Sequence, residues 1–427
     1  MSNFDKIIEN QYQLQKTVFP NYQNQELLKS QKINKAHWVS LVKDGKIFIK
    51  NKPLHIIGTH IFELSNAVHC ISYETKECFF VYVTLYNIYY GVVFKNGKIY
   101  KEHQTNNYLG YLINDNEIIQ YLAKVKLPIK ILPNFFQKKI LLFNRYSNLG
   151  HHIWNEHTGL DSFFELNLFR YIDAVFFFSY DYLNSASFFK NKKIIINSDK
   201  KRFINFSTRS ILVHPTELVI FSKTLNRLRK HISEQKSLIK IGKNIIVLQL
   251  RQNDRRWLEE VNDVPKLIEA IFKLDSSAIF IIDGFSKSFR TNLLEQQNIE
   301  RDMVAYQKIC KNLSKEIKIY TTIGLSILEK LKILEKATLV FSPIGSGGVL
   351  TNWLLQKTLI TYGPVSFFEW TRKDSECIVQ DYNNKIFYID KADIKMSSNC
   401  SDYNMNWEVL YNKFLEIMPI IKAKNSI

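Results

Sequence analysis

The sequence predicts an α/β protein with two open, doubly wound Rossmann-like units facing each other over a cleft, and an additional β-rich region at the N-terminus. Three observations lead to this prediction. Short apolar segments alternate with helix-length segments from Lys138 onward, and the alternation begins again at Asn244 after a linking helix. The 427 residues are also enough for two or three separate cores.

The N-terminal region, residues 1–136, is predicted to be an accessory β-rich region. Its first 30 or so residues are polar and are expected to be helical or loose. From His37 to His103, aromatic and β-branched segments surround the sequences KDGK (43–46) and KNGK (95–98), which resemble hairpin tips.

The first Rossmann-like domain is predicted over residues 137–236 and the second over 237–427. Expected strands of the first are KKILLFNRY (138–146), DAVFFFSY (173–180), KKIIIN (192–197) and SILVHP (210–215), followed by a linking helix over 216–235. Expected strands of the second are NIIVLQL (244–250), AIFIIDG (278–284), IKIYTTIG (317–324), TLVFSP (338–343) and TLITYG (358–363). Its expected helices are 264–273, 298–313, 326–336 and a C-terminal bracing helix over 406–423.

The chain carries 58 basic and 40 acidic residues, a net charge of +18. The basic residues are scattered and form no nucleic-acid-binding signature, so we expect anionic substrates or contact with an anionic membrane surface, and no nucleic acid. The five cysteines include no C-x-x-C pair, which argues against a zinc ribbon or a disulfide scaffold. With no signal pattern and no membrane-helix-length apolar run, the expected location is the cytoplasm, with peripheral contact at the inner face of the membrane.

A candidate base follows the first strand of the first unit. His151 and His152 lie where a helix is expected to begin, at the carboxyl end of a parallel strand, where open sheets bind ligands. Glu156 is four residues after His152, so that a carboxylate would share its helix face. Either histidine could be the base. The alternatives are a structural histidine, or a metal site that adds His157, although this spacing is not that of the H-E-x-x-H zinc helix. His214-Pro215 is interpreted as structural.

Arginines follow the first strand of the second unit. Arg251 ends a buried strand, and the adjacent Arg255 and Arg256 are expected to diverge, one into the cleft and one outside. Guanidinium groups there suit phosphate oxygens and a leaving diphosphate; the alternative is a set of surface salt bridges to neighbouring acids. Asn262 is expected to cap the next helix. Asp283-Gly284 closes the next strand and either contacts a ribose or shapes a turn.

The segment from Leu339 to Pro364 reads as strand, glycine-rich turn, helix and strand. Gly345, Gly347 and Gly348 allow a sharp turn, and Ser346 or Thr351 is expected to cap a helix over 351–356. Free amides at the helix start make a ready anion site, and the alternative is an ordinary βαβ turn. P-loop, G-x-S-x-G and D-x-D signatures are absent from the sequence.

Three blocks in this order resemble glycosyltransferase family 61, whose members have the two-Rossmann-domain GT-B fold. They are NLGHHIWNE (148–156), LRQNDRRWLEEVND (250–263) with Arg251, Arg256, Asn262 and Asp263, and ATLVFSPIGSGGVLTNWLL (337–355). The family's Pro-His-Gly-Ala is Pro-Ile-Gly-Ser here, so its donor-side histidine is replaced by Ile344.

The resemblance implies an inverting, metal-independent glycosyltransferase that uses a nucleotide-sugar donor and a glycan or glycolipid hydroxyl acceptor, with no separate cofactor, in capsule, lipopolysaccharide or other surface-glycan synthesis. His152 or His151, assisted by Glu156, would be the base. The implied donor residues are Arg251, Arg256, Asn262, Gly345, Ser346, Gly347, Gly348 and Asn352. The alternatives are a sugar-phosphate or phosphoryl transferase of capsule synthesis, and a non-enzymatic basic protein that binds polyanions or membranes.

Overall fold

A computed structural model provides the structure of the chain, which forms two compact units. Unit 1 comprises residues 1–147, 151–181 and 185–220, and unit 2 comprises 148–150, 182–184 and 221–427. The structure describes residues 25–44, 46–49, 52–55, 59–64, 67–75, 78–83, 90–95, 98–104, 138–143, 149–177, 182–196, 204–207, 210–217, 219–235, 244–288, 293–368, 379, 386–398 and 401–425.

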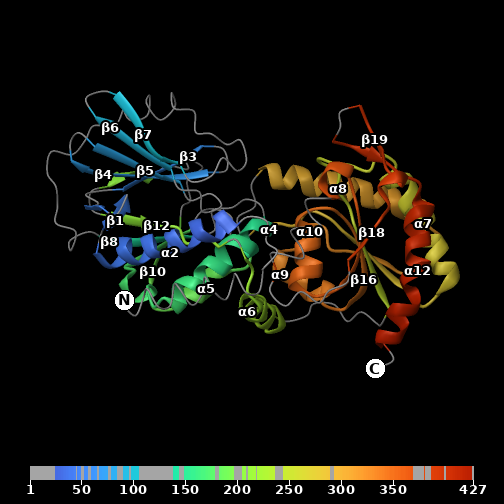
Figure 1. The fold of residues 1–427 in the computed structure, drawn as a ribbon. Coiled ribbons are helices and arrows are strands. Elements are labelled where there is room, and N and C mark those ends of the chain that lie inside the picture. The colour runs from blue at the N-terminus through green and yellow to red at the C-terminus, as the bar shows by residue number, and fades with distance from the viewer. Residues whose placement is uncertain are drawn as a thin grey trace. The chain divides into compact units, whose positions relative to one another are not determined.

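In the described part of unit 1, a helix is followed by antiparallel strands, which confirms the predicted β-rich region (Figure 1). Helix α2 (Gln25–Asp44) is followed by β1 (Lys46–Ile49), β2 (Lys52–His55), β3 (Thr59–Leu64), β4 (Ala67–Thr75), β5 (Cys78–Val83), β6 (Tyr90–Lys95) and β7 (Lys98–Gln104). Lys95 pairs with Lys98, so the predicted hairpin at KNGK is present. The KDGK prediction is wrong, because Asp44 ends α2 and the sequence joins a helix to a strand.

Two features of unit 1 tie its N-terminal part to its parallel sheet. Strand β11 (Ile204–Ser207), which the sequence did not predict, pairs antiparallel with β3 and completes a sheet of order β11-β3-β4-β5. Helix α2 contributes Trp38, Leu41 and Val42 to the core that lies on the parallel sheet. The Trp38 ring lies 6.4 Å from that of Phe163.

The parallel sheet of unit 1 has the order β10-β9-β8-β12. Its strands β8 (Lys138–Phe143), β9 (Ala174–Phe177), β10 (Lys193–Ile196) and β12 (Ser210–Val213) all lie within predicted segments. The first and last strands of this series, β8 and β12, are neighbours at the point where the strand order reverses. Ligands of open α/β sheets bind outside the carboxyl ends of strands at such a switch point.

Several helices connect these strands. They are α4 (Leu149–His151), the π-helical η2 (His152–His157) and α5 (Thr158–Glu165), which follow one another without a break, and the short η3 (Phe169–Tyr171) and η4 (Ser185–Phe189). Phe143, Phe163, Phe177 and Phe189 are almost fully buried around them, so that burial of apolar surface holds the helix on the sheet. Helix α6 (Ser222–Ser233), predicted as a linking helix, belongs to unit 2.

Unit 2 is built on a six-stranded parallel sheet of order β15-β14-β13-β16-β17-β18. Its strands are β13 (Ile245–Gln249), β14 (Ile279–Asp283), β15 (Ile319–Thr321), β16 (Ala337–Pro343), β17 (Thr358–Tyr362) and β18 (Ile386–Tyr388). Numbered along the chain, this is the order 3-2-1-4-5-6 of a dinucleotide-binding Rossmann sheet. The predicted fold class, α/β with two Rossmann-like sheets, is confirmed, and the switch point of this sheet lies between β13 and β16.

The helices of unit 2 cover both faces of its sheet, with α7 and α12 on one face and α9 and α10 on the other (Figure 1). They are α7 (Glu260–Leu274), α8 (Leu293–Lys311), α9 (Ile327–Leu334), α10 (Ser346–Gly348), the π-helical η5 (Val349–Leu354) and α12 (Trp407–Asn425). Ser326 and Glu329 form a capping box at the start of α9. The short η6 (Lys391–Asp393), β19 (Lys395–Met396) and β20 (Tyr403–Asn404) precede α12, which packs on α7 as predicted for a bracing helix.

Candidate functional site

The first cluster of polar side chains lies at the switch point of the unit 1 sheet. His152 and Glu156 come from the helix that follows β8, and His214 comes directly after β12. Residues 144–148, including Asn148 of the family resemblance, lie outside the described residues. The helix is π-helical from His152 to His157, a widened turn that occurs often at functional sites.

Glu156 joins the two histidines through its two carboxylate oxygens. Its Oε2 lies 2.6 Å from Nδ1 of His152, and its Oε1 lies 2.9 Å from Nε2 of His214. All three side chains are fully buried. Burial alone would raise the pKa of the Glu156 carboxyl, but the hydrogen bonds from His152 and His214 outweigh it and lower the pKa to about 2. Glu156 is therefore an ionised acceptor at neutral pH.

An ionised Glu156 fixes the tautomer of His152. Since the carboxylate only accepts hydrogen bonds, the His152 Nδ1 carries the proton and donates it, and Nε2 of a neutral ring then carries the lone pair. Such an imidazole can accept a proton at Nε2 while the carboxylate stabilises the resulting charge. His214 was predicted to be structural, and sequence reasoning missed its place in this cluster. The available signal was that His214 lies at the carboxyl end of the apolar segment SILVHP (210–215), where a parallel strand was expected to end.

The close approach of the helix to the loop after β12 depends on Gly159. A Cβ at this position would collide with the carbonyl of Pro215, so the two backbones meet only because position 159 is glycine. The same two segments exchange hydrogen bonds, since Asn155 Nδ2 donates to the Glu217 carbonyl at 2.6 Å and the Glu217 amide donates to the Asn155 carbonyl at 3.0 Å. Lys35 of α2 pairs with the Glu217 carboxylate at 2.5 Å.

His151 has different surroundings from His152. Its Nδ1 lies 3.0 Å from Oδ1 of Asn155, and its ring stacks on Trp154 with a centroid separation of 5.7 Å. Burial lowers its pKa, against opposing effects of the Asn155 hydrogen bond and the Glu156 charge. His151 is half-buried where His152 is enclosed, so the two predicted base candidates differ in access and in carboxylate contact.

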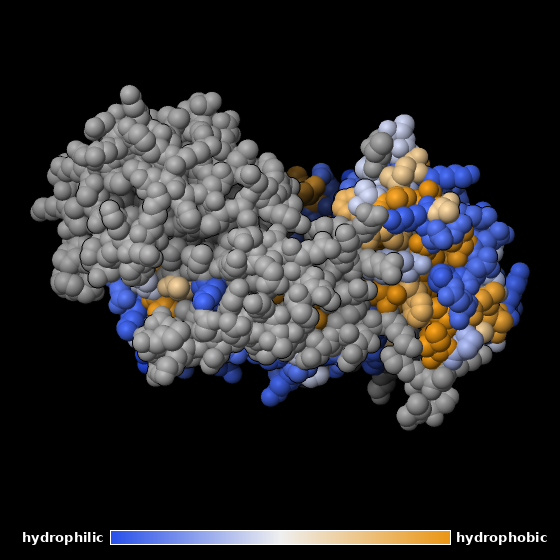
Figure 2. Space-filling view, viewed as in Figure 1, coloured by the Kyte–Doolittle hydropathy of each residue, from blue (hydrophilic) through white to orange (hydrophobic). Residues whose placement is uncertain are grey.

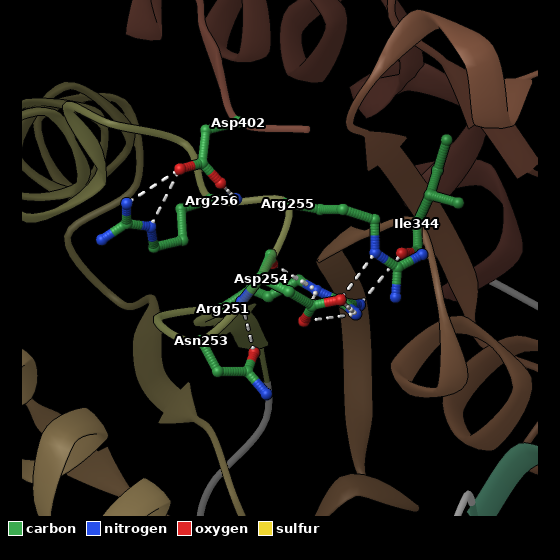
Figure 3. A network of polar contacts seen from close by, with 7 residues as sticks. All are labelled: Arg251, Asn253, Asp254, Arg255, Arg256, Ile344 and Asp402. Atoms are coloured by element: carbon green, nitrogen blue, oxygen red, sulfur yellow. Dashed lines mark hydrogen bonds and ion pairs between the residues drawn. The ribbon is translucent and has the colours of Figure 1, made fainter. Parts of the chain in front are cut away.

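The second cluster lies at the switch point of the unit 2 sheet (Figure 3). Arg251 follows β13, and its Nη1 donates to the Ile344 carbonyl, after β16, at 3.2 Å. Arg251 Nε also donates to the Asp254 carbonyl at 2.9 Å. The guanidinium of Arg251 thus spans the carboxyl ends of the two central strands, where a Rossmann sheet binds its ligand.

Arg255 and Arg256 diverge as predicted, and Arg255 is the one that joins Arg251. Its backbone has φ of +50°, a left-handed conformation that is uncommon for a residue with a side chain. Its guanidinium carbon lies 4.7 Å from the centre of the Phe367 ring. Arg256 extends in the opposite direction and pairs with Asp402 at 2.8 Å, which attaches this loop to the segment before α12 (Figure 3). Arg255 was missing from the predicted site, since adjacency alone does not show which of two arginines turns inward.

The glycine-rich turn provides the floor of this cluster. Gly345 has φ of +150°, and a Cβ there would lie 2.5 Å from Nη1 of Arg251 and 3.9 Å from Nη2 of Arg255. A Cβ on Gly347 would collide with the side-chain oxygen of Gln249 at the end of β13. The helix begins at Ser346 and continues to Leu354, so the predicted start at Thr351 is wrong, and neither Ser346 nor Thr351 caps it. Its first amides have no acceptor within the helix.

The side chains of Asp283 and Asn352 are buried and make polar contacts within unit 2. Asp283 is buried, pairs with Lys330 at 2.7 Å and accepts hydrogen bonds from Gln249 and Thr322 at 2.8 and 2.6 Å. Asn352, from the predicted donor set, is buried and donates to the Lys357 carbonyl at 2.9 Å, which fixes the turn into β17.

Glu260 is a buried acid directly behind the arginine loop. Its Oε2 accepts hydrogen bonds from the Arg251 amide at 3.2 Å and from the side chain of Gln252, while Oε1 has no hydrogen-bond partner. Burial raises the pKa of Glu260 to about 8, although these hydrogen bonds and the Arg251 charge oppose the shift. The Glu260 carboxyl therefore changes its charge near pH 8, in contact with the backbone amide of Arg251.

Asn262 does not cap α7. It lies inside the helix, whose first residue is Glu260, and its side-chain amide donates to Glu259 at 2.9 Å. It also lines a surface groove of about 810 Å³. The other lining residues are Pro265, Lys266, Glu269, Ala270, Lys273, Leu274, Asn312, Trp407 and Tyr411. Apolar and charged residues lie side by side over α7 and α12 in this outer face (Figure 2).

Within the part of the chain that the structure describes, no three histidine, cysteine or acidic side chains are grouped to hold a metal ion. None of the described helices is both long enough and apolar enough to cross a membrane.

No protein-family model and no curated protein sequence matches the chain. Among solved structures it is similar to E. coli ADP-heptose LPS heptosyltransferase II, with a TM-score of 0.35 and 9% identity over 68% of this chain and 100% of that one. It is also similar to S. aureus MnaA bound to UDP, with a TM-score of 0.30 and 9% identity over 71% of this chain and 68% of that one. A third similar structure is E. coli heptosyltransferase WaaC with ADP, with a TM-score of 0.29 and 13% identity over 66% of this chain and 98% of that one.

Proposed function

We propose that this protein is a glycosyltransferase that moves a sugar from a nucleotide-sugar donor to a hydroxyl acceptor in cell-surface glycan synthesis. The observation that carries the proposal is the convergence of the Arg251 and Arg255 guanidinium groups beside Gly345, at the switch point of a sheet with dinucleotide-binding strand order. Two cations and a glycine floor suit the two phosphates of a nucleoside diphosphate.

In the proposed reaction the first unit supplies the base. Nε2 of His152 accepts the proton of the acceptor hydroxyl, and Glu156 stabilises the imidazolium that forms. The acceptor oxygen attacks the anomeric carbon as the bond between that carbon and the diphosphate oxygen breaks. Attack from the face opposite the leaving group inverts the configuration.

The second unit holds the donor. Arg251 and Arg255 stabilise the negative charge that builds on the departing diphosphate, and the amides of Ser346 and Gly347 add further donors. These groups offer the charge stabilisation that a divalent ion would otherwise provide, so we propose a metal-independent enzyme without a separate cofactor. The nucleotide sugar is a substrate.

The proposal is tested by the thermal stabilisation that UDP, GDP, ADP and CMP produce in the presence of EDTA. One nucleotide at about 100 times its Kd should stabilise the fold by about 2.7 kcal/mol. The shift should disappear in Arg251→Ala and Arg255→Ala. The control variant Lys273→Gln should retain the shift. It removes one exposed charge from the same unit, at the far end of α7.

Two other results would overturn the proposal. Stabilisation only by heparin or anionic vesicles, unaffected by Arg251→Ala, would indicate a polyanion-binding protein. A metal requirement together with a phosphodiester product would indicate a sugar-phosphate transferase. Loss of nucleotide binding in Arg256→Ala but not in Arg255→Ala would reverse the assignment of the two arginines.

A further inference from the structure

The two arginines of the unit 2 cluster share one carboxylate, that of Asp254 (Figure 3). Asp254 Oδ1 accepts hydrogen bonds from Nε and Nη2 of Arg251 at 3.1 and 2.9 Å. Asp254 Oδ2 accepts from Nη2 of Arg251 and from Nε of Arg255, both at 3.0 Å. The carboxylate thus occupies the fork of Arg251 in the bidentate manner that a phosphate group would use.

The guanidinium of Arg251 also has contacts that do not involve this carboxylate. Its Nε also donates to the backbone carbonyl of Asp254, and its Nη1 donates to the carbonyl of Ile344. Arg255 is held separately by the face of the Phe367 ring. Removal of the Asp254 carboxylate therefore leaves both guanidinium groups anchored beside Gly345.

The contact is also one that a ligand can replace. The Asp254 side chain is 52% exposed, and an ion pair so open to water is weak. A diphosphate carries more negative charge and more acceptor oxygens than one carboxylate, so it competes effectively for the same donors.

We propose that Asp254 is an internal competitor for the diphosphate: its carboxylate occupies the two guanidinium groups in the empty enzyme and leaves them when the ligand binds. This inference rests on the proposed function of the same site. The exchange lowers the affinity for donor and for the released nucleoside diphosphate alike, because the measured affinity is the intrinsic one multiplied by the fraction of molecules with the arginines unoccupied. It thereby favours release of the product.

The test compares wild type with Asp254→Asn and Asp254→Ala by calorimetric titration of inorganic pyrophosphate and of UDP, GDP and ADP at fixed ionic strength. Both variants should bind pyrophosphate and the preferred nucleotide about three- to tenfold more tightly than wild type. The matched control is Glu259→Gln, which removes an exposed negative charge from the same loop without contact to either guanidinium. It should change the affinity less than twofold.

Equal or weaker binding by both Asp254 variants, with unchanged unfolding temperatures, would overturn the inference and make Asp254 a positioning residue for the arginines. Tighter pyrophosphate binding in the variants with no nucleotide bound by any protein would sustain the internal competitor and refute the proposed function. If neither wild type nor any variant binds pyrophosphate or a nucleotide, both proposals fail.

Discussion

The carboxylate of Glu156 lies 2.6 Å from Nδ1 of His152, with both side chains fully enclosed. Because this contact fixes the proton on Nδ1, we expect His152→Ala to lower kcat by about 10²- to 10⁴-fold, the usual contribution of a positioned base. The Kd of the nucleoside diphosphate should change little, since its proposed contacts belong to the other unit. Steady-state kinetics together with calorimetric titration measure the two quantities.

The comparison with His151→Ala decides between the two predicted bases. His151 is the more accessible residue but contacts Asn155 rather than a carboxylate, so its variant should retain most of the turnover. A near-wild-type rate in His152→Ala, with a severe loss in His151→Ala, would transfer the role of base to His151.

Acid should destabilise the fold through Glu156. Its pKa is about 2 in the folded protein and near 4.5 when unfolded, so its contribution is complete above about pH 4.5 and is lost as the pH falls towards 2. The shift corresponds to roughly 3 kcal/mol. This contribution is absent in Glu156→Gln. The difference in unfolding free energy between wild type and this variant should therefore shrink as the pH falls from about 4.5 towards 2. Urea unfolding at a series of pH values measures it, with the exposed Glu300→Gln as a control that should run parallel to wild type. A constant difference from pH 6 to 3 would contradict the assignment.

Gly347 and Gly348 should respond in opposite ways to alanine. At Gly347 a Cβ meets the Gln249 side chain, whose amide is held by Asp283, and we expect a loss of about 1–3 kcal/mol. Gly348 is helical with φ of −62°, and the nearest atom to a Cβ added there belongs to Leu359, at 3.4 Å. Alanine at this position should therefore be neutral or stabilise the fold by up to about 1 kcal/mol. Thermal unfolding of the two variants gives the comparison, and equal losses at both positions would show that this turn packs differently.

Glu260 should weaken the fold as the pH rises. Its pKa is about 8 when folded and near 4.5 when unfolded, so the contribution of the protonated acid is full below about pH 4.5 and is lost as the pH rises through 8. Glu260→Gln keeps an acceptor for the Arg251 amide without the charge. It should match wild type near pH 5 and be more stable by a few kcal/mol at pH 9. Melting temperatures across this range test the expectation, which fails if wild type and variant stay parallel.

All strands of the two parallel sheets except β18 were predicted, because buried strands are continuous apolar runs. Strand β18 has only three residues, all of them partly exposed, and gives no such run. Strand β11, with the sequence INFS, is too short and polar to give that signal, and only its pairing with β3 makes it a strand. Helix α2 lacks a strong apolar periodicity, and its role became visible only when Trp38 was found in the core of the parallel sheet.

The sequence showed which residues of the candidate site follow each strand, but not which of these residues the sheet order brings together. His152, Arg251 and Gly345 each follow an apolar strand, a local pattern that the sequence displays. His214 joins Glu156 only because β12 lies beside β8, and that neighbourhood is a property of the sheet order. Which of Arg255 and Arg256 joins Arg251 depends on the left-handed backbone of Arg255. The residue types in this loop do not predict that conformation.

The pairing of β11 with β3 has a consequence for synthesis of the chain. Strand β3 ends at Leu64 and its partner begins at Ile204, about 140 residues later. At about 5–20 residues per second, the ribosome needs roughly 7–28 s to synthesise the residues between the two strands. During this time the edge of β3 that pairs with β11 has no partner strand. A nascent chain that ends before residue 204 therefore exposes a strand edge open to association with other chains, and shortened forms lacking this segment should depend on chaperones to stay monomeric.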